Sequence, residues 1–168
     1  MRVAVAGPID LEILQPCLDT EVTSAGYRFP MTAHLVAELV TRGIPTVAVT
    51  TDPAVHAPYR LRGPSLEVHV VPSRARARDR ALDAFRAERR LRTEALVSAA
   101  PDVIHAHWTY EFAMAARATG LPTLVTVHDW APAVLRLHRD VYRTIRLGMQ
   151  ARVLSTAPAL TAVTSASS

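Results

Sequence analysis

The sequence of 168 residues contains no lysine, and all nineteen of its basic residues are arginine. The absence of lysine excludes a P-loop, which needs a lysine for nucleotide phosphates, and any mechanism that forms a Schiff base. The Gly-x-Gly-x-x-Gly fingerprint of dinucleotide-binding folds is also absent. The exclusive use of arginine has two explanations that the sequence leaves open: genomic codon bias, or contact of the planar guanidinium with phosphates or anionic lipid.

Cysteine and long apolar runs are equally scarce. Cys17 is the only cysteine, which excludes a disulfide framework and a thiolate metal site. No apolar run approaches the ~20 residues that a membrane-spanning helix needs, and the first residues do not resemble a signal peptide. We therefore expect a cytoplasmic protein, and a peripheral position at the inner face of the membrane stays open.

The residues that are present are typical of a folded domain, with 49% hydrophobic and 20% charged residues. Apolar, strand-like segments alternate with amphipathic, helix-like segments along the whole chain. This alternation predicts an α/β fold, a Rossmann-like three-layer domain with a mostly parallel sheet of six or seven strands, formed by residues 1–168 as one domain. The predicted strands are 2–7, 45–51, 65–71, 102–108, 123–130 and 159–164, and the predicted helices are 31–42, 74–99, 109–119 and 131–152. Residues 8–29 and 52–65 are predicted to be loops. Residues 165–168 resemble the first turn of a further helix.

Two neighbouring predicted strands end on polar and ring-bearing side chains. These are His105, His107 and Trp108 in one strand, and His128, Asp129 and Trp130 in the next. In an open parallel sheet the ligand crevice lies outside the carboxyl ends of the strands. The two strand ends are therefore predicted to form the functional site.

Several of these side chains also have a purely structural explanation. His105 fits a core histidine bonded to the backbone, and Asp129 fits the N-cap of the following helix as well as a direct role. His107 is balanced between the two, and His128 is the best candidate for a functional role. Histidines and an aspartate in this arrangement also suggest metal ligands. No other residues have matching spacing, so no metal is expected.

Glycines and arginines supply further candidates. Gly26 precedes the first helix, where backbone N–H groups could face an anion, although an ordinary turn glycine is the alternative. The arginine-rich segment Arg74–Arg92 fits a solvated helix face or an anionic membrane surface. Nucleic acid is not expected, because Phe85 is the single aromatic residue in that segment, which leaves too few rings for base stacking. Because its arginines are numerous and close together, we expect them to be exposed and dispensable for folding. A second set of arginines lies on one side of the predicted helix 131–152, and these arginines fit either a solvated helix face or a contact with phosphate. They are Arg136, Arg139, Arg143 and Arg146.

The order of these segments resembles a known family. The run Asp102-Val-Ile-His-Ala-His-Trp, a helix, and then Gly-Leu-Pro-Thr-Leu-Val-Thr-Val-His-Asp resemble the N-terminal domain of GT-B glycosyltransferases of family 4. The earlier run Ala25-Gly26, with a helix that ends at Gly43 and the strand Val-Ala-Val-Thr-Thr, adds to the resemblance. It covers nearly the whole chain, although Ala25-Gly26 stands where the family usually has two glycines.

The resemblance implies a retaining transferase that moves a sugar from a nucleotide-sugar donor to a sugar or lipid-linked acceptor, without a cofactor. It implies that this chain carries the acceptor side, and that a C-terminal donor-binding domain, in cis or in trans, is needed for activity. On the matching positions, the loop around Gly26 approaches the donor phosphates and His128 lies near the transferred sugar. We assign catalysis to His128 and Asp129, and substrate binding to Gly7, Gly26, His107, Trp108 and Tyr110.

Two alternatives remain at this point. One is a non-catalytic interaction module that has the same fold but no donor-binding half. The other is a metal-dependent hydrolase that uses His105, His107, His128 and Asp129.

Overall fold

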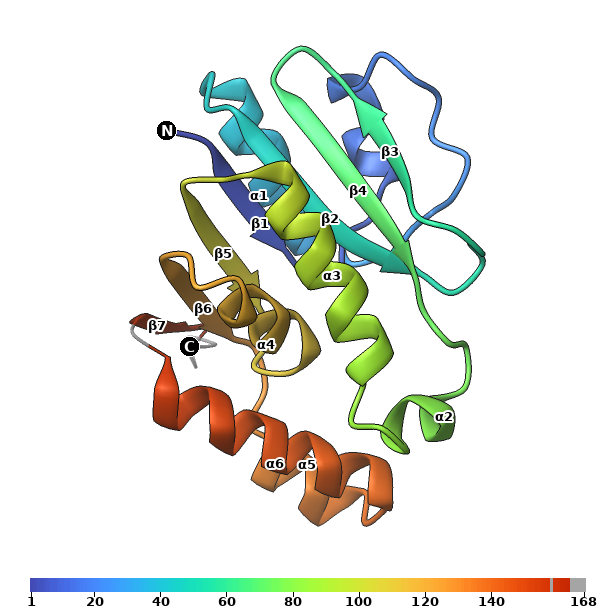
Figure 1. The fold of residues 1–168 in the computed structure, drawn as a ribbon, viewed down its shortest axis with the longest axis vertical. Coiled ribbons are helices and arrows are strands. Elements are labelled where there is room, and N and C mark those ends of the chain that lie inside the picture. The colour runs from blue at the N-terminus through green and yellow to red at the C-terminus, as the bar shows by residue number, and fades with distance from the viewer. Residues whose placement is uncertain (158, 164–168) are drawn as a thin grey trace, which may run out of the picture.

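A seven-stranded sheet runs through the computed structural model, which describes residues 1–157 and 159–163. Its strand order is β3-β4-β2-β1-β5-β6-β7, and every neighbouring pair is parallel except β3 with β4. Figure 1 shows the strands fanned across the domain. The strands are β1 Val3–Ala6, β2 Thr46–Asp52, β3 Tyr59–Arg62, β4 Leu66–Pro72, β5 Val103–His107, β6 Thr123–Val127 and β7 Ala159–Ala162.

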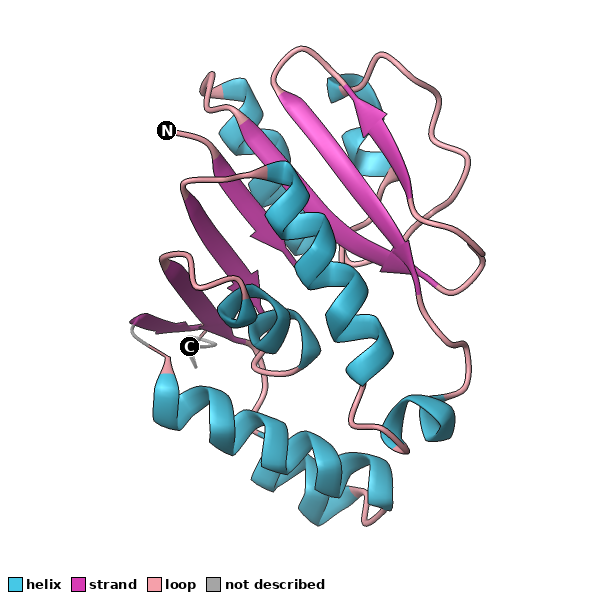
Figure 2. Ribbon diagram, viewed as in Figure 1, coloured by secondary structure: helices cyan, strands magenta, loops and turns pink. Residues whose placement is uncertain are grey.

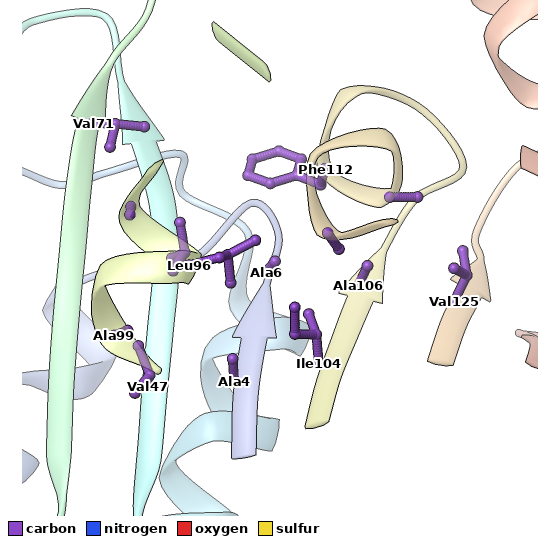
Figure 3. Close-up of a cluster of buried hydrophobic side chains, with 14 of the residues drawn as sticks. Ala4, Ala6, Val47, Val71, Leu96, Ala99, Ile104, Ala106, Phe112 and Val125 are labelled. Atoms are coloured by element: carbon purple, nitrogen blue, oxygen red, sulfur yellow. The ribbon is translucent and has the colours of Figure 1, made fainter. Parts of the chain in front are cut away.

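Helices cover both faces of this sheet (Figure 2). Helix α1 (Pro30–Thr41) and the 3-10 helix η1 (Glu12–Cys17) pack on one face, in a cluster with Val5 and Ala48. Helices α3 (Arg86–Ala99) and α4 (Glu111–Ala118) pack on the other, in a cluster with Ala4 and Ala6, which Figure 3 shows. The alternation of Ala4, Val5 and Ala6 between the two clusters follows from the two-residue period of a strand. The remaining helices are α2 Ala77–Ala81, α5 Ala131–Leu137 and α6 Val141–Thr156.

The strand order defines where a ligand site is expected. From β1 the chain proceeds to β2 and β4 on one side of the sheet, and then returns to β5 on the other side of β1. The carboxyl ends of β1 and β5 therefore form a topological switch point, where ligands bind in open α/β sheets. The predicted α/β fold with a mostly parallel sheet is confirmed, and the edge predicted to be functional lies at this switch point.

Two predicted loops contain regular structure. Residues 52–65 include β3, an edge strand that pairs antiparallel with β4 and buries only Leu61. A single buried residue among several prolines gives too weak an alternation for a strand prediction. The long loop 8–29 contains η1, whose Leu14 is buried in the cluster beneath α1.

Two predicted helices are each broken into two, so these predictions were wrong. Between α2 and α3 the chain turns at Ala84 and Phe85, which have positive φ angles of 49° and 61°. Phe85 is buried in a small cluster with Tyr110 and Met149, and this tertiary contact holds the break. Between α5 and α6 the chain turns at Asp140, whose side chain caps α6 by accepting from the Arg143 N–H at 2.8 Å.

The end of the chain is only partly described. The last predicted strand is observed as β7, but residue 164 and the helical turn predicted at 165–168 lie outside the described residues. Among the helices of the described residues, none is both long and apolar enough to cross a membrane.

Candidate active site

A pair of histidines joins the ends of β5 and β6. His107 is the last residue of β5, and His128 comes directly after β6. The Nδ1 atom of His107 lies 2.9 Å from the Nε2 atom of His128, so one ring donates a hydrogen bond to the other. His105 bonds the Thr126 hydroxyl at 2.7 Å, so the expected backbone bond of His105 was wrong. The structure thus brings together the two strand ends that the sequence singled out.

Burial lowers the pKa of each histidine in this row. The pKa of His107 falls to about 3, because the positive charges of His105 and His128 would add to the cost of burying its own charge. Burial also lowers the pKa of His128, and the neighbouring Asp129 only partly opposes it. For His105 the causes are burial and then His128. All three rings are therefore neutral at pH 7.

The neutral pair has a preferred proton arrangement. The Nε2 atom of His107 is buried and has no hydrogen-bond partner among the described residues. If the Nδ1–H of His107 donates to His128, that Nε2 atom is a bare nitrogen rather than a stranded N–H donor. The proton of His128 then sits on its Nδ1 atom, which can donate to a ligand. We infer this tautomer from the hydrogen-bond pattern.

The buried state of His107 predicts a pH-dependent stability. Because the pKa of His107 is about 3 in the folded chain and near 6.5 when unfolded, protonation favours the unfolded state. The contribution of His107 is complete above pH 6.5 and is lost as the pH falls towards 3. Its loss is about 1.4 kcal/mol per pH unit, or about 2 kcal/mol between pH 6.5 and pH 5.

Urea unfolding at pH 7.5 and pH 5 measures this loss. The variant His107→Gln should lose about 2 kcal/mol less over that interval than the unmodified chain. The exposed His34→Gln provides a matched control that keeps the full loss. Identical pH profiles for the unmodified chain and His107→Gln would contradict the buried neutral state.

Trp108 makes an aromatic corner beside the histidines. Its φ angle of 68° is left-handed, a conformation that costs a bulky residue about 1–2 kcal/mol. The indole ring meets Tyr27 and Phe29 edge-on, with ring centroids 6.0 and 5.7 Å away. Phe29 also meets His128 edge-on at 5.9 Å. The strained turn therefore directs Trp108 against the loop that precedes α1, and closes one side of the site.

Asp129 belongs to a second polar group at this edge. Its Oδ1 atom accepts a hydrogen bond of 2.7 Å from the buried Tyr110 hydroxyl, and its Oδ2 atom lies 4.0 Å from Arg146. The Arg146 guanidinium stacks 3.6 Å from the centre of the Tyr110 ring. Burial and the bond to Asp129 raise the pKa of Tyr110. The N-cap of α5 is Trp130, so the alternative role of Asp129 as that cap was wrong.

Gln150 connects the segments that follow β5 and β6, and it was not among the residues predicted from the sequence. This buried amide of α6 donates to the Thr109 hydroxyl at 2.7 Å and to the Asp129 carbonyl at 2.9 Å, and it accepts from the Ala131 N–H at 2.8 Å. A single side chain thus fixes the segment after β5 against the segment after β6. The signal in the sequence was a glutamine on the apolar side of a helix, with Met149 and Val153.

The two glycines predicted to bind substrate, Gly7 and Gly26, both lie at places where the backbone passes close to other residues. A Cβ atom on Gly7 would lie 2.9 Å from the Cβ of His107, so only glycine lets the end of β1 approach the histidine. Gly26 has a φ angle of 66°, and its N–H donates to the Asp52 carboxylate at 3.2 Å. That N–H is therefore occupied by a carboxylate of the chain itself in this conformation.

The N-terminus of α1 offers another group for an anion. Thr32 lies in the first turn of α1, and its buried Oγ1 atom has no hydrogen-bond partner among the described residues. Its methyl carbon is 3.4 Å from the position of a Cβ on Gly7. The positive end of the helix dipole and a free hydroxyl therefore meet at the switch point. Thr32 was not among the residues predicted from the sequence.

The four residues proposed as metal ligands do not form a ligand set. His107 and His128 bond each other, and Asp129 accepts from Tyr110. Within residues 1–157 and 159–163, no group of three or more histidine, cysteine or acidic side chains could hold a metal ion.

The arginine-rich segment differs from its prediction. Arg92 is 2% exposed and stacks 4.3 Å from the centre of the Phe112 ring. Arg74 forms a two-pronged ion pair with the buried Glu88, with N–O distances of 2.9 and 2.6 Å, and also bonds Asp83 at 2.7 Å. The expectation of a uniformly exposed basic face is therefore wrong, because part of this charge is buried or paired inside the domain.

The second arginine set is also divided. The predicted stripe spans the break between α5 and α6, so its members do not share one helix. Arg136 lies on α5, whereas Arg146 lies in the site against Tyr110 and has an 18% exposed side chain.

A groove opens next to these residues rather than over the histidine pair. It has a volume of about 780 Å³ between α5 and α6 and reaches Trp130. Its apolar lining includes Leu135, Val141 and Leu147, and Arg136 and Arg139 contribute positive charge.

Comparison with known proteins identifies the family. The model of glycosyltransferase family 4 matches residues 31–167. The chain belongs to glycosyltransferase family 4. This confirms the predicted resemblance, and the domain has the Rossmann-like fold of the N-terminal half of a GT-B glycosyltransferase.

Solved structures agree with the fold of this family 4 domain. Sucrose-phosphate synthase from Thermosynechococcus elongatus matches with a TM-score of 0.61 and 15% identity, over 95% of this chain and 41% of that one. Trehalose-6-phosphate synthase, OtsA, matches with a TM-score of 0.50 and 13% identity, over 88% and 39%. The chain thus spans about two fifths of the length of these proteins. A search of curated proteins by sequence found no match.

Proposed function

We propose that this family 4 domain is the acceptor side of a retaining glycosyltransferase that moves a sugar from a nucleotide-sugar donor to an acceptor. The observation that carries the proposal is the neutral pair of His107 and His128 at the switch point, next to the first turn of α1. A donor-binding domain, in cis or in trans, would supply the other wall of the cleft. No metal or cofactor is part of the proposal.

Each polar group has a defined task in this proposal. The Nδ1–H of His128 donates to a hydroxyl of the transferred sugar, and His107 holds the ring in the required tautomer. Thr32 and the N-terminus of α1 attract the donor phosphates. The Asp129 carboxylate, held by Tyr110 and Arg146, accepts from an acceptor hydroxyl. Retention in this family is attributed to front-face attack, in which the leaving phosphate takes the acceptor proton, so no protein nucleophile is required.

The groove between α5 and α6 supports an acceptor with an apolar portion. It begins at Trp130, one residue after Asp129, and its lining is mostly apolar. Nearby Leu137 and Val141 are 80% and 74% exposed, which is unusual for large apolar side chains. A lipid-linked acceptor would place its chain along these residues and an anionic linkage near Arg136 or Arg139.

Calorimetric titration of the chain tests this division of labour. We expect nucleotide sugars to bind with a Kd weaker than ~1 mM, since the donor is held mainly by the other domain. Alkyl glycosides should bind more tightly than the same sugars without the alkyl chain. Tight binding of any nucleotide sugar would place the donor site in this domain and contradict the proposal.

Activity is tested after a family 4 donor-binding domain is supplied. Sugar transfer by the combined protein supports the enzyme. An absence of transfer with every donor and acceptor pair would favour the alternative of a non-catalytic interaction module.

A further inference from the structure

Three arginines meet at a hollow on the outer surface of the helical layer. Arg89 comes from α3, Arg117 from the last turn of α4, and Arg152 from α6. The hollow has a volume of about 240 Å³, which exceeds the ~30 Å³ share of one water molecule. Its other lining residues are Met114, Ala118 and Val153. None of these residues belongs to the candidate active site.

The positive charge of this hollow is not neutralised within the described part of the chain. The hollow has no carboxylate in its lining, and none of the three guanidinium groups forms an ion pair with a described residue. The Asp83 carboxylate attracts the charge of Arg89 electrostatically. This carboxylate already accepts a hydrogen bond from Arg74 at 2.7 Å, however. By contrast, the exposed Arg90 on the same helix pairs with Glu94 at 2.7 Å.

The guanidinium of Arg89 lacks good hydrogen-bond acceptors among the described residues. Its Nε atom is buried without a hydrogen-bond partner among the described residues, and its Nη1 atom is 3.9 Å from the Met114 sulfur, a weak acceptor. Burial lowers the pKa of Arg89, and the charges of Arg152 and Arg86 lower it further against the opposing effect of Asp83. A partly buried guanidinium without acceptors is stabilised most by an anion that accepts two parallel hydrogen bonds from it.

Arg117 and Arg152 complete the arrangement. Arg117 donates to the Thr156 hydroxyl of α6, which holds its side chain across the gap between α4 and α6. Arg152 is exposed on α6, close enough for its charge to repel Arg89. An anion between the three side chains would turn this repulsion into attraction.

We propose that Arg89, Arg117 and Arg152 form a binding site for a phosphoryl group, separate from the candidate active site. Tetrahedral phosphoryl oxygens can accept from several guanidinium groups that approach from different helices, as these do. The phosphoryl group belongs either to a soluble phosphate or diphosphate or to a phospholipid headgroup. The proposal does not depend on the proposed transfer activity.

Thermal unfolding of the chain with sodium pyrophosphate tests the site, and sodium chloride at equal ionic strength serves as the reference. Pyrophosphate at 100 times its Kd should raise the Tm by about 5–10 °C relative to the chloride reference. The double variant Arg89→Gln/Arg152→Gln should lose this rise. The matched control Arg86→Gln/Arg90→Gln removes the same charge from outside the hollow and should keep it. If Arg89→Gln prevents folding, the exposed Arg152→Gln alone should weaken pyrophosphate binding at least 10-fold.

Flotation with phosphatidylcholine vesicles that contain phosphatidic acid distinguishes the two sources. Vesicle binding that pyrophosphate displaces, and that only the hollow variant loses, identifies a lipid headgroup. Pyrophosphate stabilisation without vesicle binding identifies a soluble ligand. Equal Tm shifts in chloride and pyrophosphate, or equal loss in the hollow and control variants, would overturn the site.

Discussion

Replacing His128 with alanine should lower the turnover of the reconstituted two-domain enzyme by at least ~100-fold, the scale of losing one well-placed catalytic hydrogen bond. His128 is half-buried at the end of its strand, and its Nε2 atom is held 2.9 Å from His107. Removing the imidazole removes the proposed Nδ1–H donor but leaves the sheet intact. The expected loss therefore appears in turnover, and the Tm should change by only a few degrees.

His34→Ala is the matched control for this experiment. His34 is exposed on α1, so its loss should leave both turnover and Tm unchanged. Initial rates at saturating donor and acceptor, with thermal unfolding of each variant, give the comparison. A His128→Ala variant that keeps normal turnover, or one that unfolds, would count against the catalytic assignment.

Replacing Arg92 with glutamine should destabilise the domain by about 3–5 kcal/mol, because this change breaks a buried charge interaction. Arg92 is 2% exposed and lies on the Phe112 ring. Burial disfavours the charge of Arg92, whereas the buried carboxylates of Glu111 and Glu88 favour it. The Oε2 atom of Glu111 and the Nε and Nη1 atoms of Arg92 have no hydrogen-bond partner among the described residues. Loss of the guanidinium removes part of the positive charge that stabilises the Glu111 carboxylate, which also interacts with Arg146. For a chain of this size the Tm should fall by about 6–20 °C.

Arg90→Gln, two residues along the same helix, is the control. Its side chain is 81% exposed, so its replacement should leave the Tm within about 2 °C. If the lost charge interaction is the cause, adding Glu111→Gln to Arg92→Gln should recover part of the stability. Similar Tm values for the Arg92 and Arg90 variants would show that Arg92 is not a structural charge. The same measurement tests the expectation from the sequence that the arginines of Arg74–Arg92 are dispensable for folding, because a large fall in the Tm of Arg92→Gln would contradict it.

The sequence by itself determined the class of fold and the edge of the sheet that carries the candidate site. Alternation of apolar strand segments with amphipathic helices is a local signal, and it predicts a parallel sheet covered on both faces. The polar residues at the ends of β5 and β6, including His107 and His128, are an equally local signal, because they mark where each strand leaves the apolar core. Connection rules for parallel strands then place these endings at one edge.

The tertiary structure decided how each polar side chain is used. Gln150 meets Thr109 and Asp129 across 41 and 21 residues of sequence, and no local pattern specifies such partners. The break before α3 depends on the burial of Phe85 against Tyr110 and Met149, which overrides the helical periodicity of the segment. Arginines with the same sequence spacing become exposed, paired or buried according to what packs against them. Burial and partner choice are long-range properties, so only the folded chain separates Arg92 from Arg90 and places Arg146 on Tyr110.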